Sequence, residues 1–156
     1  MIPDLLWHQI VASVPIVCVD VCIVWDGAAL LVLRAEAPAR GRWWVPGGRL
    51  VKGEQTRSTA WRKAREEAGI DVKVGPVVHA EELCFPDGPG GSGVHSVTTC
   101  YLATPVGVPQ PRIDGTSRAW AWCKDPDDFW QDMGEGEAER IVLHDYVRAC
   151  LRGAGL

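Results

Sequence analysis

The chain lacks closely spaced cysteine pairs, although it contains six cysteines: Cys18, Cys22, Cys84, Cys100, Cys123 and Cys150. Thiolate zinc sites commonly use C-x-x-C pairs, so this scatter argues against a structural zinc site. At 156 residues the chain is large enough to fold without a disulfide framework, and its first residues lack the charged and apolar regions of a secretory signal. We therefore expect reduced thiols in the core and a cytoplasmic protein.

The sequence also lacks an excess of positive charge: 16 Lys and Arg residues stand against 20 Asp and Glu residues, for a net charge of −4. Nucleic acids and membrane surfaces are polyanionic and require a basic face, so we expect neither as a partner. Long apolar runs are missing too, because the stretch from Val14 to Trp25 contains Asp20 and is too short to cross a bilayer. A small anionic ligand is still compatible, since a few arginines and a metal ion can hold it.

The hydrophobic pattern contains no internal repeat and no linker, and it predicts one α+β domain over residues 1–156. Strands are expected at 16–25, 28–36, 43–46, 71–83, 94–103 and 118–123, with an Asp-Gly hairpin turn between the first two. Helices are expected from Asp4 to before Pro15 with Leu5 on its apolar side, from Gln55 to Ala68, and over 136–151. The glycine- and proline-rich segment 85–93 suits a mobile flap.

Chemistry-bearing residues gather on the central predicted helix and in the turn before it. Glu66 and Glu67 follow Lys63 by three and four positions, which places the three side chains on neighbouring parts of one helix face. Crowded carboxylates repel one another unless a cation neutralises them, and hard oxygen ligands suit Mg²⁺ or Mn²⁺. Gly47 and Gly48 allow a metal ion or phosphate to approach the backbone closely, because no Cβ intervenes.

The spacing of these residues resembles the Nudix box, G-x5-E-x7-R-E-U-x-E-E-x-G-U with U aliphatic, over residues 48–70. The matching residues are Gly48, Glu54, Arg62, Glu66, Glu67, Gly69 and Ile70, preceded by the "VPGG" lead-in. The resemblance implies an α/β/α sandwich around a mixed sheet and a hydrolase of nucleoside diphosphates linked to another moiety. It also implies a divalent metal held on the box helix.

One position departs from the box, because Lys63 stands where the box has the glutamate of "RE". In many Nudix hydrolases that glutamate binds metal or acts as general base, so a lysine there should lower the number of cations that the site holds. One interpretation is that Lys63 pairs with Glu67 at i, i+4, which contributes ~0.2–0.5 kcal/mol. The other is that the chain belongs to a branch that works without that glutamate.

The segment from Val14 to Leu50 resembles GDP-mannose mannosyl hydrolases, a branch that also lacks this glutamate. That branch binds Mg²⁺ through a Gly-Gly backbone carbonyl and the last glutamate of the helix, and it substitutes at the sugar carbon. The resemblance implies metal ligation by Gly47 and Glu67, to which we add Glu66. Positions that match contacts to the nucleotide sugar or its diphosphate are Asp20, Arg34, Arg49, Arg62 and Tyr101.

The general base is left open, because the region 114–122 contains no histidine where that branch carries one. A water could be activated by Glu66 instead, and other candidates are Glu81, Glu82, Asp87, His95 and Asp114. We assign catalytic roles to Glu54, Arg62, Glu66 and Glu67. Of the tryptophan pairs Trp43–Trp44 and Trp120–Trp122, strand alternation predicts that each buries one ring and leaves the other able to stack on a base.

These patterns predict a Mg²⁺-dependent hydrolase, with Mn²⁺ as a possible substitute, that acts on a nucleotide linked through a diphosphate. A nucleotide sugar resembling GDP-mannose is the preferred substrate, and carbon attack is one of two open routes. The alternatives are phosphorus attack on a nucleoside triphosphate or dinucleotide, and a Nudix domain that binds a nucleotide metabolite without turnover. A homodimer is compatible with the family resemblance.

Overall fold

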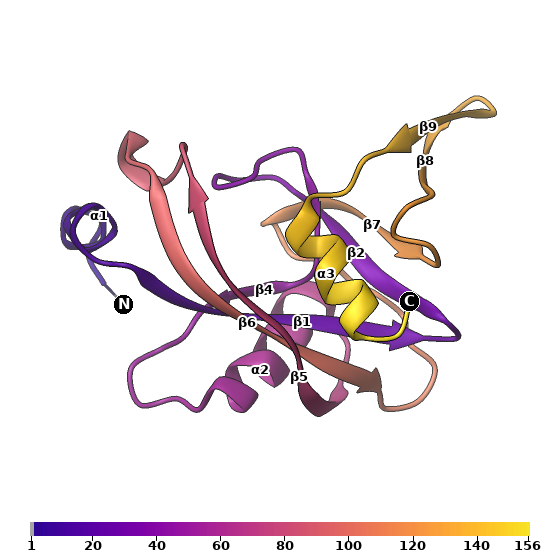
Figure 1. Cartoon of the computed structure of the whole chain (residues 1–156), viewed down its shortest axis with the longest axis horizontal. Coiled ribbons are helices and arrows are strands. Elements are labelled where there is room, and N and C mark those ends of the chain that lie inside the picture. The colour runs from indigo at the N-terminus through magenta and orange to yellow at the C-terminus, as the bar shows by residue number, and fades with distance from the viewer. Residues whose placement is uncertain (1) are drawn as a thin grey trace.

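A computed structural model describes residues 2–156 of the chain (Figure 1). The helices are α1 (Asp4–Ser13), α2 (Thr56–Ala68) and α3 (Asp145–Gly153), with a short 3-10 turn η1 (Pro89–Gly91). The first strands are β1 (Ile16–Trp25), β2 (Ala28–Arg34), β3 (Trp43–Trp44) and β4 (Gly47–Arg49). The later strands are β5 (Val72–Phe85), β6 (Val94–Pro105), β7 (Ser117–Cys123), β8 (Phe129–Gly134) and β9 (Glu137–Ile141).

Seven of the strands form one mixed sheet, in the order β3-β2-β1-β6-β5, with β4 paired to β1 and β7 paired to β2. The central pair β1–β6 is parallel, whereas the pairs of β1 with β2 and β4 are antiparallel. At the β1–β2 turn, Asp26 and Gly27 both have positive φ, at 49° and 71°. Two positive φ angles are typical of a type I′ hairpin turn, so the predicted Asp-Gly turn is confirmed.

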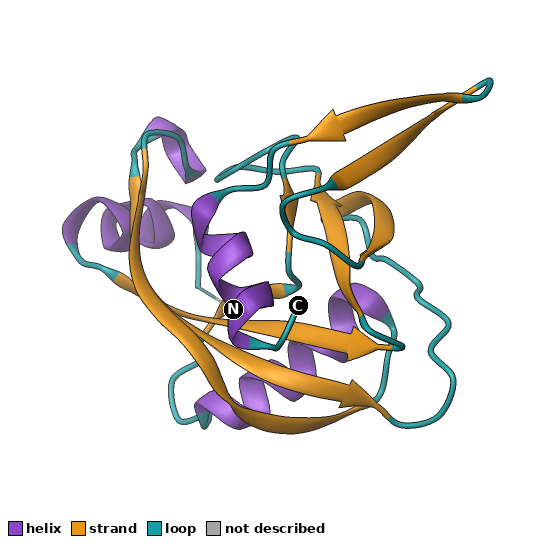
Figure 2. Ribbon diagram, turned by 45° about the vertical axis from the view of Figure 1, so that its right-hand side comes forward, coloured by secondary structure: helices purple, strands orange, loops and turns teal. Residues whose placement is uncertain are grey.

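Helices α2 and α3 cover opposite faces of the sheet (Figures 1 and 2). Alternate residues of β1, including Val21 and Ile23, pack in one buried cluster with Ala60 and Ala64 of α2. A larger cluster on the other face joins β1 and β6 to α3 through residues such as Cys22, Cys100, Tyr146, Val147 and Leu151. This arrangement confirms the predicted α+β class and the α/β/α sandwich.

The prediction of a helix over 136–151 is wrong for the first half of that range. Residues Glu137–Ile141 form β9, which pairs antiparallel with β8, and helix α3 begins only at Asp145. The hairpin turns at Gly134, Glu135 and Gly136, all of which have positive φ. Helix-forming residues such as Glu and Ala are compatible with β9 because strand pairing to β8 decides the backbone conformation there.

The expectation of one buried and one exposed ring in the pair Trp43–Trp44 is also wrong, because both side chains are 5% exposed. The rings point to opposite sides of β3, but both sides are covered. Trp43 packs edge-on against Phe129 at 5.4 Å, and Trp44 stacks on Tyr146 at 5.4 Å. In the second pair Trp120 is 41% exposed and Trp122 is only partly buried, so the expected fully buried ring is missing there too. The two residues are two positions apart on β7 and therefore lie on the same face, so alternation does not separate them.

All six cysteines are free, and four are buried, although Cys84 is exposed. Leu5, expected on the apolar side of α1, is 81% exposed. Segment 85–93 packs on α1 through η1, because a Cβ added to Gly90 would lie 2.9 Å from the ring of His8. Within residues 2–156, every helix is too short or too polar to cross a membrane.

Candidate active site

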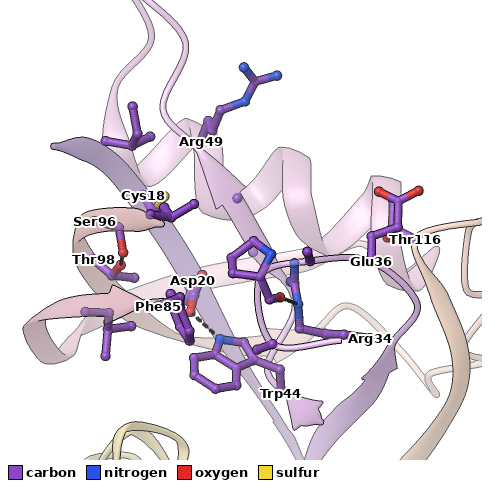
Figure 3. A pocket seen from close by; sticks show the side chains of 18 of the residues that line it. Cys18, Asp20, Arg34, Glu36, Trp44, Arg49, Phe85, Ser96, Thr98 and Thr116 are labelled. Atoms are coloured by element: carbon purple, nitrogen blue, oxygen red, sulfur yellow. Dashed lines mark hydrogen bonds between the residues drawn. The ribbon is translucent and has the colours of Figure 1, made fainter. Parts of the chain in front are cut away.

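A cavity of about 310 Å³ opens over the face of the sheet where β1, β4 and β6 meet the loop after β2 (Figure 3). Alternate residues of β1 and β6 form its floor, because side chains of one strand face point the same way. The charged residues that line it are Asp20, Arg34, Glu36, Arg49, Lys63 and Glu67. Ser96 and Thr98 from β6 add buried hydroxyls, which hydrogen-bond to each other at 3.2 Å.

Gly47 and Glu67 meet at this cavity from strand β4 and helix α2. The Gly47 N–H donates a hydrogen bond of 3.1 Å to Oε2 of Glu67. Along β4, Val21 N–H donates to the Pro46 carbonyl, so the next pair, Asp20 and Gly47, occupies a non-hydrogen-bonded position of the ladder. Both backbone groups of Gly47 therefore point away from β1, toward α2. This geometry makes the Gly47 carbonyl available beside the Glu67 carboxylate.

Asp20 is 6% exposed, and its carboxyl group lies directly under Gly47. Its Oδ2 accepts hydrogen bonds from Trp44 Nε1 at 3.1 Å and from the Tyr146 hydroxyl at 3.0 Å. A Cβ on Gly47 would lie 1.9 Å from Asp20 Oδ1, so no larger residue fits there. Burial raises the pKa of Asp20 to about 7, although the two hydrogen bonds oppose the shift. The group can therefore hold a proton near neutral pH.

The side chain of Glu67 is buried, with 8% of its surface exposed. Burial raises the pKa of the Glu67 carboxyl, while the Lys63 ammonium and the Gly47 amide act to lower it. Lys63 Nζ lies 3.1 Å from Glu67 Oε1 and 3.3 Å from Glu66 Oε2. The i, i+4 pairing expected for Lys63 is thus present, and the same side chain also lines the cavity.

The oxygen atoms available at Glu67 are suitable ligands for a hard divalent cation. A carboxylate offers about four lone-pair sites, and Lys63 and the Gly47 amide use two of those on Glu67. Within residues 2–156, no group of three His, Cys, Asp or Glu side chains is placed to hold a metal ion. The protein thus supplies few ligands, as is usual for Mg²⁺, which keeps several waters and binds substrate phosphates.

Arg62, in the middle of α2, and Glu54, just before the helix, form a two-pronged ion pair outside the cavity lining. Arg62 Nε and Nη2 each lie 2.8 Å from a different oxygen of Glu54. Hydrogen bonding to Arg62 lowers the pKa of Glu54 to about 2. Arg62 also donates to the Arg49 carbonyl at 3.3 Å and to Glu66 at 3.1 Å. This network fixes the loop between β4 and α2, and so positions Arg49 at the cavity.

The two arginines of the cavity are anchored by groups on different elements, the loop after β2 and helix α1, and Figure 3 shows the hydrogen bond of Arg34. Arg34 Nε donates to the Pro38 carbonyl at 2.7 Å. The Arg49 guanidinium stacks over the ring of Trp7 at 4.0 Å. Trp7 comes from α1 and lines the cavity, yet the sequence interpretation considered only tryptophans in strands. An aromatic residue on the apolar side of an N-terminal amphipathic helix was the available signal.

Like Arg62 and Glu54, the predicted site residues Tyr101 and Glu66 lie outside the cavity lining, and the roles of all four stay predictions. The Tyr101 hydroxyl bonds with Thr56 at 2.7 Å, and its ring belongs to the cluster that packs against α2. Glu66 is 47% exposed at the rim and pairs with Arg62 and Lys63. The sequence interpretation missed the cavity residues Trp7, Cys18, Glu36, Ser96, Thr98 and Thr116.

The candidate bases Glu81, Glu82, Asp87, His95 and Asp114 are likewise absent from the cavity lining. His95 instead lines a separate hollow between α1 and β6. Of these candidates, Asp114 interacts with residues that line the cavity. Its charge raises the pKa of Glu67, and its Oδ1 accepts a hydrogen bond from the N–H of Thr116 at 2.9 Å.

The chain matches the NUDIX domain family over residues 15–144. It is 48% identical over 73 residues to the low-salt glycan biosynthesis protein Agl8 of Haloferax volcanii, an alignment that covers 47% of each chain. It is 33% identical over 78 residues to the human 8-oxo-dGDP phosphatase NUDT18, covering 50% of this chain and 21% of that protein. The chain thus spans less than half the length of these relatives.

Solved structures agree with the fold. A MutT NUDIX hydrolase of Burkholderia pseudomallei superposes with a TM-score of 0.69 and 28% identity, covering 90% of this chain and 98% of that one. An ADP-ribose pyrophosphatase of Streptococcus suis shares the fold with a TM-score of 0.62 at 18% identity, covering 92% and 94% of the two chains. The family match and the fold together show that the chain belongs to the Nudix family of hydrolases.

Proposed function

We propose that this Nudix hydrolase uses Mg²⁺ to cleave a nucleotide that is linked through a diphosphate to another moiety, with a nucleotide sugar as the preferred substrate. The observation that carries the proposal is the joining of the Gly47 backbone and the buried Glu67 carboxylate at one end of a cavity lined by Arg34 and Arg49. Oxygen ligands and arginine forks in one cavity fit a metal-bound diphosphate, because guanidinium pairs bidentately with phosphate oxygens.

A sugar as the linked moiety is supported by two observations. The cavity lining also includes the hydroxyls of Ser96 and Thr98 and, under Gly47, the carboxyl of Asp20. Buried hydroxyls and a carboxyl suit a polyhydroxylated ligand, since each can donate or accept a hydrogen bond. The similarity to Agl8, which its name assigns to glycan biosynthesis, points the same way.

The chain's own residues account for most of the proposed chemistry. When bound, Mg²⁺ would offset the charge of the diphosphate and stabilise it as a leaving group. Arg34 and Arg49, each held by a protein contact, would pair with phosphate oxygens and resist reorientation. Asp20 would hold or accept a proton, because burial raises its pKa to about 7.

A second candidate is phosphorus attack on a nucleoside triphosphate or dinucleotide. It is favoured by the similarity to NUDT18, whose name describes an 8-oxo-dGDP phosphatase. In that case Glu66, at the rim beside Glu67, would share the metal site. A third candidate is binding of a nucleotide metabolite without turnover, which the ion pair between Lys63 and Glu67 favours.

One experiment separates the three. The protein is incubated with Mg²⁺ and a panel of nucleotide sugars, dinucleotides and nucleoside triphosphates, and the products are separated by ion-exchange chromatography. Free sugar with nucleoside diphosphate indicates carbon attack, and sugar phosphate with nucleoside monophosphate indicates phosphorus attack. Turnover of triphosphates alone would refute the nucleotide-sugar proposal, and ligand binding without turnover of any compound would establish the binder.

A further inference from the structure

We propose that the Lys63 ammonium is a resident cation of the active site that binds the substrate diphosphate directly. The inference rests on the proposed function, because it names the residue that would hold the diphosphate next to Glu67. Lys63 would then act as a fixed positive charge beside the metal ion. Activity would need fewer metal ions than a site with a carboxylate at this position.

The placement of Lys63 is the first support. Its side chain is 18% exposed, it lines the cavity, and its Nζ lies 3.1 Å from Glu67 and 3.3 Å from Glu66. An ammonium has three N–H donors, and these two carboxylates engage at most two of them. At least one donor is therefore free for a ligand oxygen at the Glu67 end of the cavity.

Gly48 is the second support, because its lack of a side chain accommodates Lys63. A Cβ added to Gly48 would lie 2.6 Å from Cε and 3.0 Å from Nζ of Lys63. The φ angle of Gly48 is outside the left-handed region, so the backbone itself does not require glycine there. The end of the lysine side chain lies close to the β4 backbone, so a larger residue at Gly48 would displace it.

The charge balance of the cavity is the third support. The lining contains three acidic residues, Asp20, Glu36 and Glu67, and a diphosphate adds further negative charge. Arg34 and Arg49 are anchored to Pro38 and Trp7 respectively. Lys63 is the cavity cation that contacts Glu67, so it is placed to offset the repulsion between that carboxylate and a phosphate.

The test measures binding of inorganic pyrophosphate in EDTA by isothermal titration calorimetry, so that no metal contributes. We expect Lys63→Met to weaken binding by about ten-fold or more, because a charge-assisted hydrogen bond is lost. Lys63→Arg, which keeps the charge, should bind within about three-fold of the unmodified protein. Lys124→Met removes the same charge from an exposed position outside the cavity, and it should have no effect.

Gly48→Ala is an independent test, because it displaces the Lys63 ammonium without changing any charge. It should weaken pyrophosphate binding as Lys63→Met does, with folding checked by circular dichroism. In a Mn²⁺ titration followed by electron paramagnetic resonance, Lys63→Glu should raise the number of ions bound per chain. Pyrophosphate binding by Lys63→Met as tight as that of the unmodified protein, or no metal-free binding by the latter, would overturn the inference.

The two proposals fail in different ways. If the unmodified protein hydrolyses nucleotide sugars while Lys63→Met retains full pyrophosphate affinity, the role of Lys63 is wrong and the function stands. If pyrophosphate binding depends on Lys63 but no compound of the panel is turned over, the catalytic function is wrong and the anion-binding role of Lys63 stands.

Discussion

The amide of Gly47 donates a hydrogen bond of 3.1 Å to the Glu67 carboxylate, across twenty residues of sequence. This bond fastens strand β4 to the C-terminal half of helix α2 and orients a buried carboxylate toward the cavity. This bond and the one from Lys63 leave about two lone-pair sites on Glu67, and the carbonyl of Gly47 is also available, so the contact that joins β4 to α2 is compatible with the proposed metal binding.

Glu67→Gln is expected to lower hydrolysis by about 100-fold or more, because an amide is a poor ligand for a hard divalent cation. The amide oxygen can still accept the Gly47 N–H, so folding should be retained. The measurement is turnover of the best substrate of the panel, with Mn²⁺ affinity measured in parallel. Glu66→Gln, at an exposed position outside the cavity lining, should cost much less. Undiminished turnover by Glu67→Gln would disprove the metal assignment.

Gly47→Ala is expected to lower the free energy of unfolding by about 1–3 kcal/mol, because overpacking forces neighbouring groups to move. The added Cβ would lie 1.9 Å from Asp20 Oδ1 and 2.8 Å from the Asp20 backbone, which cannot shift freely. Urea unfolding measures the change. Gly115→Ala is the matched control, since a Cβ there meets nothing within 4 Å. Equal stabilities of the two variants would contradict the packing of Asp20 under Gly47.

Asp20 predicts a pH dependence of stability. Its pKa is about 7 in the folded protein and 3.8 ordinarily, so the folded state retains a proton that the unfolded state loses between these values. The stability contribution is complete below pH 3.8, falls as pH rises to about 7, and is lost above it. The fall is on the order of 4 kcal/mol, since one pKa unit corresponds to about 1.4 kcal/mol.

Asp20→Asn should lack this fall while preserving an acceptor for Trp44 and Tyr146. The free energy of unfolding of Asp20→Asn minus that of the unmodified protein should therefore be larger at pH 7.5 than at pH 4.5. Chemical unfolding of both proteins in EDTA at the two pH values measures the difference. A stability difference that is the same at both values would show that Asp20 is ionised throughout.

Arg62→Met is expected to impair activity more than stability. The ion pair with Glu54 is partly exposed, so its loss should cost about 1 kcal/mol or less. The loop that carries Arg49 to the cavity would lose its anchor, however, and the Michaelis constant should rise. Arg65→Met is the control, because it removes an exposed contact with Trp61 on the same helix. It should change stability by a similarly small amount and leave activity unchanged. If Arg62→Met and Arg65→Met have the same Michaelis constant, Arg62 does not position the loop.

Local patterns were sufficient for much of the fold. The helix expected from Gln55 to Ala68 is present as α2, with Gln55 as its N-cap and Gly69 in the left-handed conformation at its C-terminus. The Asp-Gly turn joins β1 and β2 as expected. Such features depend on backbone preferences and on neighbours within one or two helical turns, which adjacent residues encode.

The structure decided what depends on contacts between distant segments. Pairing with β8 made 137–141 a strand, although its residues suit a helix. Phe129 packs against Trp43 and Tyr146 packs against Trp44, so both rings are buried where alternation predicted one. No spacing rule could show these outcomes, because alternation specifies which face a side chain takes and not what covers that face.

The candidate site divides in the same way. The sequence by itself determined that Glu66 and Glu67 share a helix that follows a Gly-Gly pair, because helical periodicity fixes their positions. Only the tertiary structure decided that Glu67 is buried at the cavity while Glu66 stays at its rim. It alone brought Tyr146 to Asp20 across 126 residues, since chain folding and not spacing joins such groups.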